Sequence, residues 1–411
     1  LPVSISPTIK DAAFLKSAPV QELLKLLNVD GEEARIAGGA VRNALIGQPV
    51  KDVDIATTAL PSEVIRRAEE AGHRTVPTGI DHGTITVIIG GEPFEVTSLR
   101  ADSDHDGRRA QVAFGRDWKV DAERRGFTIN GLYADADGAV IDLVGGLKDI
   151  ESRTVRFIGD AEARIKEDYL RVLRFFRFYA WYGHGRPDSD AIRAIVRLKD
   201  GISQLSAERV WSELKKLLSA PDPSRALLWM RQSGVLTDVL PESGKWGIDL
   251  IHALVKAERE HGWPSDPLLR LEAIVPPYDT RMKELGDRLR LSKAEAMRLA
   301  GWAKSGEAKP ARTDKLLALD LYRGDRQGVA DRLRLAIAAA SEKADAKAIE
   351  SLVRQLAFSE NWVRPEFPLS GADMLSNGMD AGPEVGRRLK QLEEKWVASG
   401  FELTKAQLLD S

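Results

Sequence analysis

The chain has 411 residues, with 60 lysine and arginine residues against 62 aspartate and glutamate residues, and a formal net charge of −2. This near balance excludes a uniformly basic nucleic-acid binder, so any RNA contact must come from local segregation of charge. The absence of cysteine excludes disulfides, zinc–thiolate sites and thiol chemistry. No apolar run approaches the length of a membrane span and the start lacks a signal-peptide pattern, so we expect a cytoplasmic protein with no membrane partner.

The first strong signal along the chain is a Gly–Gly pair between a predicted strand and a predicted helix. Residues 34–37 favour a short strand that ends at Gly38 and Gly39, and residues 40–46 favour a helix that Gly47 stops. A Gly–Gly turn in front of a helix lets backbone N–H groups approach a phosphate. We therefore expect these two glycines to form a phosphate cradle.

Two carboxylates follow the cradle. Residues 51–57 alternate in polarity, which predicts a strand with Val53 and Ile55 on one face and Asp52 and Asp54 on the other. Carboxylate oxygens are ligands for divalent metals. A solvated strand edge accounts for most Asp–X–Asp pairs, but the Gly–Gly turn upstream favours a metal site here.

A third carboxylate is predicted on a neighbouring hairpin. Residues 84–89 and 94–99 favour two strands joined by a turn at Gly90 and Gly91. Glu95 is opposite in phase to its apolar neighbours, so it can face the two aspartates from the adjacent strand. The plain alternative is an exposed strand glutamate.

Beyond the head, strand alternation disappears and helical periodicity takes over. The predicted fold is α+β, a small mixed-sheet head followed by an all-α neck, body and tail. We expect an N-terminal helical extension, a head, a neck, a body and a tail at residues 1–30, 31–150, 151–218, 219–345 and 346–411.

One predicted helix of the neck, residues 164–179, carries Asp168 and Arg171 three positions apart on one face. The plain alternative is an intrahelical ion pair of Arg171 with Glu167 or Asp168. The functional interpretation is a protein template for a nucleobase. A carboxylate can accept from the exocyclic amine of cytosine or adenine while a guanidinium donates to the ring nitrogen. Uracil and guanine present a carbonyl beside a ring N–H, so a donor and an acceptor are exchanged and neither protein group finds its partner. Each mispaired buried group costs roughly 1–3 kcal/mol.

These motifs resemble those of the class II tRNA nucleotidyltransferases (CCA-adding enzymes) and bacterial poly(A) polymerases, within the DNA polymerase beta superfamily. The resemblance covers roughly residues 30–217, and five motifs in family order are far more specific than any one. In chain order, the motifs are residues 37–42 with Asp52, Asp54 and Thr57; residues 124–130; Asp142 with Gly145 and Gly146; residues 167–174; and residues 206–209 with 213–216.

The resemblance implies an enzyme that adds CCA to the 3′ end of tRNA from CTP and ATP, without a nucleic-acid template, and releases pyrophosphate. It implies catalytic roles for Asp52, Asp54 and Glu95, with two Mg²⁺ ions held by the aspartates, and the tRNA acceptor end as partner. The nucleotide contacts that it implies are Gly38, Gly39, Arg42, Arg124, Arg125, Asn130, Asp168, Arg171 and Arg174.

The chain departs from the family pattern at three positions. Asn43 stands where many members have Asp, and Gly131 stands where Ala is usual. Gly126 stands where the family has the Asp of Arg-Arg-Asp, a carboxylate associated with recognition of the ribose. We therefore expect weaker discrimination between ribonucleotides and deoxyribonucleotides.

A polar connector over residues 102–121 contains Arg108, Arg109, Arg116 and Lys119. By resemblance it is the family's flexible loop, which helps the site switch from C to A. Its full length favours complete CCA addition. A mobile surface loop without this role is the plain alternative.

Two helix starts are predicted near the C-terminus, at residues 370–375 and 382–388. Arg387, Arg388 and Lys390 lie close to the second start and could hold an RNA phosphate. A packing unit with a solvated basic face explains the pattern equally well.

The sequence is also compatible with two other functions. One is a poly(A) polymerase or a partial CC- or A-adding enzyme, which shares the same chemistry. The other is an RNA-binding protein with impaired catalysis, for which Gly126 is the only support. The sequence gives no indication of the oligomeric state.

Overall fold

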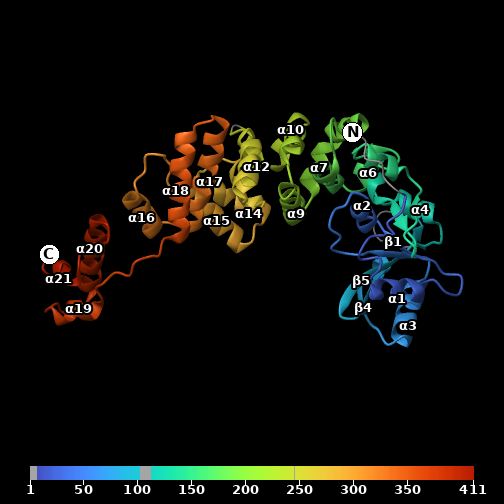
Figure 1. Ribbon diagram of the computed structural model, residues 1–411, viewed down its shortest axis with the longest axis horizontal. Helices are drawn as coiled ribbons and strands as arrows, with labels where there is room; N and C mark the ends of the chain where they lie inside the picture. The colour runs from blue at the N-terminus through green and yellow to red at the C-terminus, as the bar shows by residue number, and fades with distance from the viewer. Residues whose placement is uncertain (1–6, 102–112, 245) are drawn as a thin grey trace. The chain divides into compact units, whose positions relative to one another are not determined.

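The computed structural model describes residues 7–101, 113–244 and 246–411 (Figure 1). The chain divides into two compact units. The first comprises residues 1–205 with 232–235, and the second comprises residues 206–231 with 236–411.

A seven-stranded mixed sheet forms the centre of the first unit, as predicted. Its order is β3-β4-β5-β2-β1-β8-β9, in which β2 and β5 are parallel and the other neighbours are antiparallel. The strands are β1 (Ala34–Ala37), β2 (Ile55–Thr57), β3 (Arg74–Gly79), β4 (Thr84–Ile89), β5 (Glu92–Ser98), β8 (Leu132–Ala134) and β9 (Val140–Asp142). A separate pair joins β6 (Arg100–Ala101) to β7 (Ala113–Phe114).

The hairpin of β4 and β5 forms where the sequence predicts it. Gly90 and Gly91 have φ values of 60° and 86°, and positive φ at both turn residues matches the twist of a two-residue hairpin. Ile85 and Val87 are fully buried. Glu95 is exposed between buried neighbours, so its predicted phase is confirmed.

Helices cover the sheet and continue into the neck. α1 and α3 contact each other, and both contact the sheet. The helices of this unit are α1 (Ala18–Leu27), α2 (Gly39–Leu45), α3 (Pro61–Glu70), α4 (Trp118–Glu123), α5 (Gly146–Glu151), α6 (Ala161–Glu167), α7 (Leu170–Tyr182) and α8 (Ser189–Leu198).

An aromatic cluster attaches α7 to the head. Phe127 lies 4.8 Å from Phe157 and 5.1 Å from Phe178, measured between ring centroids, and Phe157 lies 5.8 Å from Phe175. All four rings are nearly or fully buried. Burying such rings contributes roughly 1.5–3 kcal/mol each, so this cluster fixes the neck helix against the segment that begins at Arg124.

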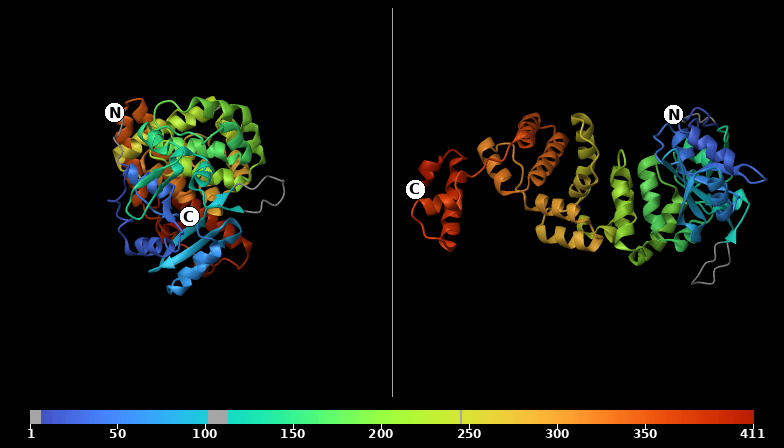
Figure 2. Two further views of the ribbon diagram at one scale, coloured as in Figure 1. Left: turned by 90° about the vertical axis from the view of Figure 1, so that its right-hand side faces the viewer. Right: turned by 90° about the horizontal axis from the view of Figure 1, so that it is seen from below.

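The described part of the second unit is helical, as predicted (Figure 2). Leu333 and Ile337 pack with Leu352 in one core, and Tyr322 packs with Trp396 in another. The helices are α9 (Ala207–Leu218), α10 (Ser224–Gln232), α11 (Val235–Val239), α12 (Leu250–His261), α13 (Pro267–Glu272), α14 (Asp279–Leu289), α15 (Lys293–Lys304), α16 (Asp314–Arg323), α17 (Arg326–Glu342), α18 (Ala346–Asn361), α19 (Gly371–Ser376), α20 (Pro383–Ser399) and α21 (Lys405–Leu409).

A buried ion pair joins three of these helices. Arg270 of α13 donates to Glu258 of α12 at 2.6 Å, and both residues are almost fully buried. The same guanidinium donates to the carbonyls of Leu218 and Ala220, at and just beyond the end of α9. Removing one partner of such a pair leaves an uncompensated buried charge.

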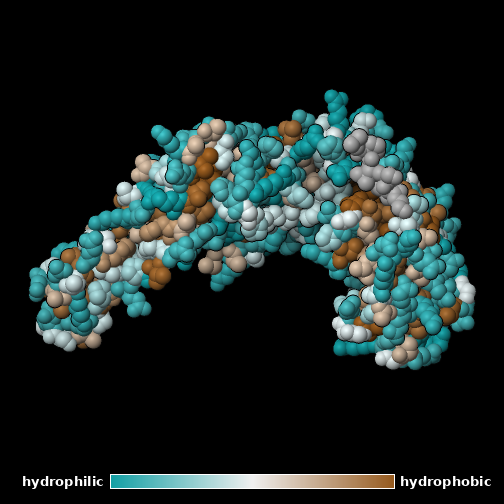
Figure 3. All heavy atoms as spheres, in the orientation of Figure 1, coloured by the Kyte–Doolittle hydropathy of each residue, from teal (hydrophilic) through white to brown (hydrophobic). Residues whose placement is uncertain are grey.

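Hydrophilic side chains cover much of the face drawn in Figure 3. Within the described ranges, no helix is both long and apolar enough to cross a membrane.

Candidate active site

The Gly38–Gly39 turn lies between β1 and α2, where the sequence predicts it. Gly38 has a φ of 64°, in the left-handed region that favours glycine. A Cβ atom on Gly38 would lie 3.3 Å from Nη1 of Arg125 and 3.4 Å from the carbonyl oxygen of Asn130. The absence of a side chain therefore lets the segment that carries Arg125 and Asn130 pack directly against the turn.

Asp52 and Asp54 do not lie in a strand, so this part of the prediction is wrong. β2 begins at Ile55, and the last backbone bond toward β1 runs from the N–H of Ala37 to the carbonyl of Asp54 at 2.9 Å. Because the chain turns at Gly38, no β1 backbone remains to pair with the residues before Asp54. The two carboxylates are exposed at the end of the sheet instead.

Glu95 lies beside Asp54. The parallel register pairs Ile55 with Val96, so the residues that precede them are neighbours at the same edge of the sheet. Desolvation of the Asp54 carboxylate raises its pKa, and the charges of Glu95 and Asp52 raise it further against the opposing charge of Arg125. Among the described residues, none of the three carboxylates has an ion-pair partner.

The donor set at this edge fits Mg²⁺ in chemistry. Within the described ranges, no three carboxylate or histidine side chains form a ready-made metal cage. Mg²⁺ rarely needs one, because it is commonly held by one or two carboxylates together with substrate phosphates and water. Asp52 and Asp54 supply such a pair, without a competing protein cation at bonding distance.

Arg125 is held beside the turn by two buried side chains. Its Nε donates to Oδ2 of Asp121 and to the hydroxyl of Tyr133, both at 3.1 Å, and the Tyr133 hydroxyl donates to the same Asp121 oxygen at 2.7 Å. Burial raises the pKa of Tyr133, against the opposing charge of Arg125. The network fixes a cation near Asp54 and Gly38. Oδ2 of Asp121 takes part in both bonds.

Arg42, predicted to contact the nucleotide, is buried and only 6 % exposed. Its Nη1 donates to Oδ1 of Asn130, its Nη2 donates to Oδ1 of Asn43 at 2.9 Å, and Nη2 also donates to the Tyr182 hydroxyl at 2.8 Å. The guanidinium stacks 4.0 Å from the centroid of the Tyr182 ring. Arg42 thus connects α2, the segment of Asn130 and α7.

The predicted continuous helix over residues 164–179 is wrong. α6 ends at Glu167 and α7 begins at Leu170, because Asp168 has an extended backbone with a φ of −156°. The Asp168 carboxylate accepts from the N–H of Leu170 at 3.0 Å, which satisfies an orphan donor at the start of α7. A local cap therefore outweighs helix continuation here.

The template pair is not assembled as an Asp168–Arg171 contact in this structure. Arg171 forms its ion pair with Glu167, and its Nη1 also donates to the Arg164 carbonyl at 2.7 Å. Asp168 and Arg171 stay adjacent through the backbone, since the Arg171 N–H donates to the Asp168 carbonyl at 3.0 Å.

Gly126 lies against the template arginine. It has a φ of 83°, and a Cβ atom there would lie 3.6 Å from Nε of Arg171. A non-glycine residue at this position would therefore carry backbone strain. The second and fourth motifs meet at this point.

Arg174 and Arg177 extend the basic face of α7 beyond Arg171. The three arginines recur every third residue and are half-buried, while the residues between them are buried. Arg177 lies close enough to Arg42 to contribute to the lowering of its pKa, which desolvation dominates. Arg177 and Tyr182 were not singled out from the sequence, although the arginine spacing of three was visible there.

Arg124 is half-buried and lies near Arg100. Burial, and next the charge of Arg124, lower the pKa of Arg100. Arg100 and Arg124 therefore lie close together, next to Arg125.

Only the end of the predicted polar connector can be compared with the structure. Residues 102–112, with Arg108 and Arg109, lie outside the described residues. The remainder comprises β7, a short segment at residues 115–117 and the start of α4. Arg116 pairs with Glu32 at 2.6 Å.

The predicted helix starts of the tail are confirmed at α19 and α20. Arg387 pairs with Glu384, and Arg388 donates to the carbonyl of Ser411 at 2.9 Å. Lys390 is exposed. Their contact with RNA stays a prediction.

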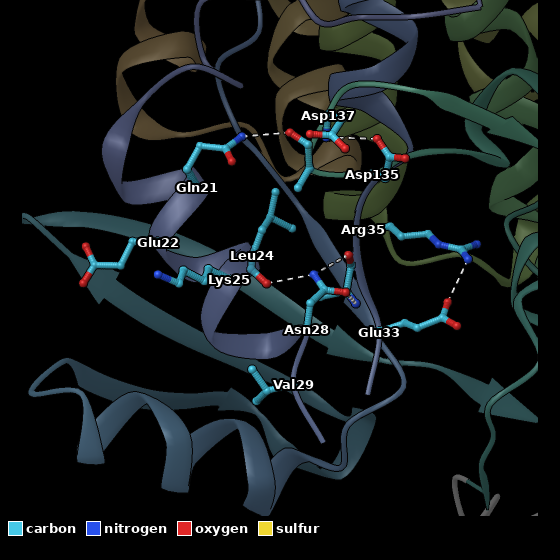
Figure 4. A pocket seen from close by; sticks show the side chains of 12 residues that line it. Gln21, Glu22, Leu24, Lys25, Asn28, Val29, Glu33, Arg35, Asp135 and Asp137 are labelled. Carbon is cyan, nitrogen blue, oxygen red and sulfur yellow. Dashed lines mark hydrogen bonds and ion pairs between the residues drawn. The ribbon is translucent and has the colours of Figure 1, made fainter. Parts of the chain in front are cut away.

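A separate hollow of about 860 Å³ lies between α1 and the start of β1 (Figure 4). Gln21 and Asn28 at its wall donate to the backbone carbonyls of Ala136 and Leu24 at 3.0 and 2.8 Å. None of the motif carboxylates or arginines discussed above lines it, so the size of this hollow does not make it the active site.

A mixed sheet with paired carboxylates at its end, a glycine turn beside them and a fixed arginine define a nucleotidyltransferase of the DNA polymerase beta type. A family model described as "Poly A polymerase head domain" matches residues 34–156. A second, described as "Probable RNA and SrmB- binding site of polymerase A", matches residues 186–245.

Comparison with individual proteins shows to which family of nucleotidyltransferases the chain belongs. The mitochondrial CCA tRNA nucleotidyltransferase 1 of Mus musculus is 35% identical over 399 residues, which cover 95% of this chain and 88% of the relative. A CCA-adding enzyme of Geobacillus thermodenitrificans is 39% identical over 228 residues, 54% of this chain and 55% of the relative. The crystal structure of the Bacillus stearothermophilus CCA-adding enzyme in complex with CTP matches with a TM-score of 0.74 and 26% identity over 95% of each chain. The chain belongs to the CCA tRNA nucleotidyltransferase family.

Proposed function

We propose that this protein adds the sequence CCA to the 3′ end of tRNA from CTP and ATP, without a nucleic-acid template, and releases pyrophosphate. One observation carries the proposal. Asp54 lies beside Glu95 and near Asp52, Gly38 and Arg125, in a chain that is similar to CCA tRNA nucleotidyltransferases along nearly its full length. The relatives' names favour CCA addition over poly(A) synthesis.

Each residue at the end of the sheet has its own role in the proposed phosphoryl transfer. The tRNA 3′-hydroxyl attacks the α-phosphate of the nucleotide in line, and pyrophosphate leaves. Asp52 and Asp54 are the proposed ligands of two Mg²⁺ ions, which would supply activation of the hydroxyl and neutralisation of the leaving group when bound. Glu95 acts as a third ligand or accepts the hydroxyl proton. The backbone N–H of Gly39, together with Arg125, receives the phosphates. The N–H of Gly38 donates to the Leu132 carbonyl at 2.8 Å, so Gly38 serves the cradle by its turn and not as a donor.

Selection of the base falls to the start of α7. Asp168 accepts from the exocyclic amine, and Arg171 donates to the ring nitrogen, which admits CTP and ATP. In the structure Arg171 pairs with Glu167. The incoming base therefore has to compete with the Glu167 carboxylate for the guanidinium.

Residues 186–245 are the proposed site of contact with the tRNA acceptor end, since they match a family model described as RNA-binding. The proposed location is the cytoplasm, although the relatives include a mitochondrial enzyme.

Replacing either aspartate tests the chemistry. We expect Asp52→Ala and Asp54→Ala to abolish transfer while tRNA affinity and the fold persist. The pKa of Asp54 is raised, so the native state holds that proton more tightly than the unfolded state and ionised Asp54 destabilises the fold at neutral pH. Thermal unfolding without Mg²⁺ should therefore show no loss of stability in Asp54→Ala. Either variant with more than a few per cent of the wild-type rate would contradict the assignment.

A further inference from the structure

A cavity of about 450 Å³ lies within the second unit, among α12, α13, α15, α17 and α18. Cavities of this size accept small organic molecules. Apolar side chains make up much of the wall, and three polar side chains from different helices face the same space. The apolar ones include Leu250, Leu335, Ala336, Ala340 and Leu352, and the polar ones are Glu272, Trp302 and Arg332.

Two of these polar side chains are buried without a partner. Glu272 ends α13 and Trp302 lies on α15, and each is only 1 % exposed. Within the described ranges, neither carboxyl oxygen of Glu272 forms a hydrogen bond, and the indole Nε1 of Trp302 forms none either. Buried polar groups are nearly always paired, because an unmade hydrogen bond there costs stability. Two such groups on one cavity therefore point to a ligand.

The Glu272 carboxyl has no counter-cation of its own. Arg298 lies near it but binds Asp266 at 2.6 Å and Asp331 at 2.9 Å. Burial, and next the charge of Asp331, raise the pKa of Glu272 well above its usual value, against the opposing charges of Arg298 and Arg332. The neutral acid is therefore favoured, and it offers an O–H donor beside a carbonyl acceptor.

Arg332 of α17 adds a further donor. Its Nε and Nη2 donate to the carbonyls of Trp302 and Ala303 at 3.0 and 3.2 Å, and its guanidinium lies 4.9 Å from the centroid of the Trp302 ring. Nη1 has no hydrogen-bond partner in the part of the chain that the structure describes. The cavity thus offers Nε1 of Trp302 and Nη1 of Arg332 as donors, and the Glu272 carboxyl as donor and acceptor.

A carboxamide matches these groups better than an ion does. Its NH₂ group donates to the Glu272 carbonyl oxygen, and its own oxygen has two lone pairs to accept from Trp302 and Arg332. A carboxylate ligand lacks the donor, and an ammonium ligand lacks the acceptor. We propose that this cavity is a binding site for a small neutral molecule that carries a primary carboxamide on an apolar body.

The exposed part of the lining favours a free small molecule over a base of bound RNA, whose edge also presents donors and acceptors. Glu307 and Asp345 are exposed there, and among the described lining residues Lys343 is the one exposed cation. Because the carboxylates outnumber the lysine, the entrance does not attract a phosphate backbone.

Benzamide is the probe of the proposed chemistry. Benzoate and benzylammonium are its matched controls, because they keep the ring and lack the donor or the acceptor. Ligand-observed NMR titrations of the full chain at neutral pH should show saturable binding of benzamide with a Kd in the millimolar range, and binding at least about tenfold weaker for both ions. Equal binding of all three compounds, or no saturable binding of benzamide, would overturn the proposal.

Substitutions at the wall locate the binding. Glu272→Leu and Trp302→Phe should each raise the Kd for benzamide about tenfold, because each removes a hydrogen-bonding group from the cavity. Glu272→Leu should not lower the melting temperature, since it removes an unpaired buried group. Glu284→Leu is the control, because Glu284 is exposed on α14, and its Kd should equal that of the wild type. Unchanged affinity in both cavity variants would overturn the proposal.

Glu272→Gln tests whether the neutral form of the carboxyl binds. The glutamine amide keeps a donor beside an acceptor, so its Kd should stay close to that of the wild type. A loss as large as that of Glu272→Leu would contradict the carboxamide assignment.

Addition of a tRNA that ends before CCA separates a free ligand from an RNA base. The Kd for benzamide should not change, and displacement of benzamide would assign the cavity to the RNA and overturn the proposal. Binding of benzamide does not require transfer activity, so a failure of the proposed function would be seen separately, as absence of nucleotide addition by the wild-type protein.

Discussion

Arg171 has two candidate partners, the Glu167 carboxylate and a bound nucleobase. Its guanidinium pairs with Glu167 in the structure, although Asp168 is the proposed second half of the base template. Arg171 can form the ion pair with Glu167 when no nucleotide is bound and can bind the base when one is. The two interpretations of this arginine are therefore compatible. The pair with Glu167 is partly exposed, so it is worth little on its own and is easily replaced.

Nucleotide selection tests the template at the residue scale. We expect Asp168→Ala and Arg171→Ala to lower the rate with CTP and ATP and to relax the rejection of UTP and GTP by roughly tenfold or more, since each lost partner removes about 1–3 kcal/mol of discrimination. The measurement is kcat/KM for each nucleotide supplied alone.

Arg66→Ala is a control for loss of a helical ion pair. Arg66 lies on α3 and pairs with Glu63 and Glu70, both at 2.6 Å. Its nucleotide preference should equal that of the wild type. An unchanged preference in both template variants would leave Arg171 as a structural ion pair.

Among the helices and strands, those that depend on a local sequence pattern were predicted correctly. The β4–β5 hairpin and the Gly38 turn are confirmed, because alternation and glycine positions are local signals. The break between α6 and α7 was missed because it depends on the Asp168 carboxylate capping Leu170, a competition that periodicity does not register. The extent of β2 was wrong because it depends on where β1 ends.

The Arg42 network could not be derived from sequence for a different reason. Asn43 is adjacent to Arg42, but Asn130 and Tyr182 lie 88 and 140 residues away along the chain. Only the folded structure brings them together. The family resemblance implies that Arg42 contacts the nucleotide, which stays a prediction, and the structure adds its protein partners.

The buried pair of Arg270 and Glu258 gives a prediction for the helical unit. Glu258→Ala should destabilise it by about 3–5 kcal/mol, because a buried guanidinium loses its counter-charge. Glu260→Ala, on the same helix, removes an exposed carboxylate 3.6 Å from Lys256 and should cost less than about 1 kcal/mol. Urea unfolding followed by circular dichroism compares the two. Equal losses of stability would contradict a structural role for the buried pair.

At the scale of the whole molecule, the head supplies chemistry common to many nucleotidyltransferases, and the product is a property of the full chain. The mouse relative aligns with nearly all of this chain, beyond the head and neck motifs. That extent favours a tRNA acceptor over a generic RNA end. A formal net charge of −2 leaves RNA binding to local basic surfaces rather than to the overall charge.

The most direct test of the proposed function is the length of the product formed on a tRNA that ends before CCA. The purified protein is incubated with this tRNA, Mg²⁺, and CTP and ATP singly and together, and the products are resolved to one nucleotide. Complete CCA addition predicts two additions with CTP alone, three additions with both nucleotides, and no further extension. A long adenosine tail, an arrest at one or two nucleotides with both substrates present, or no addition at all would contradict it.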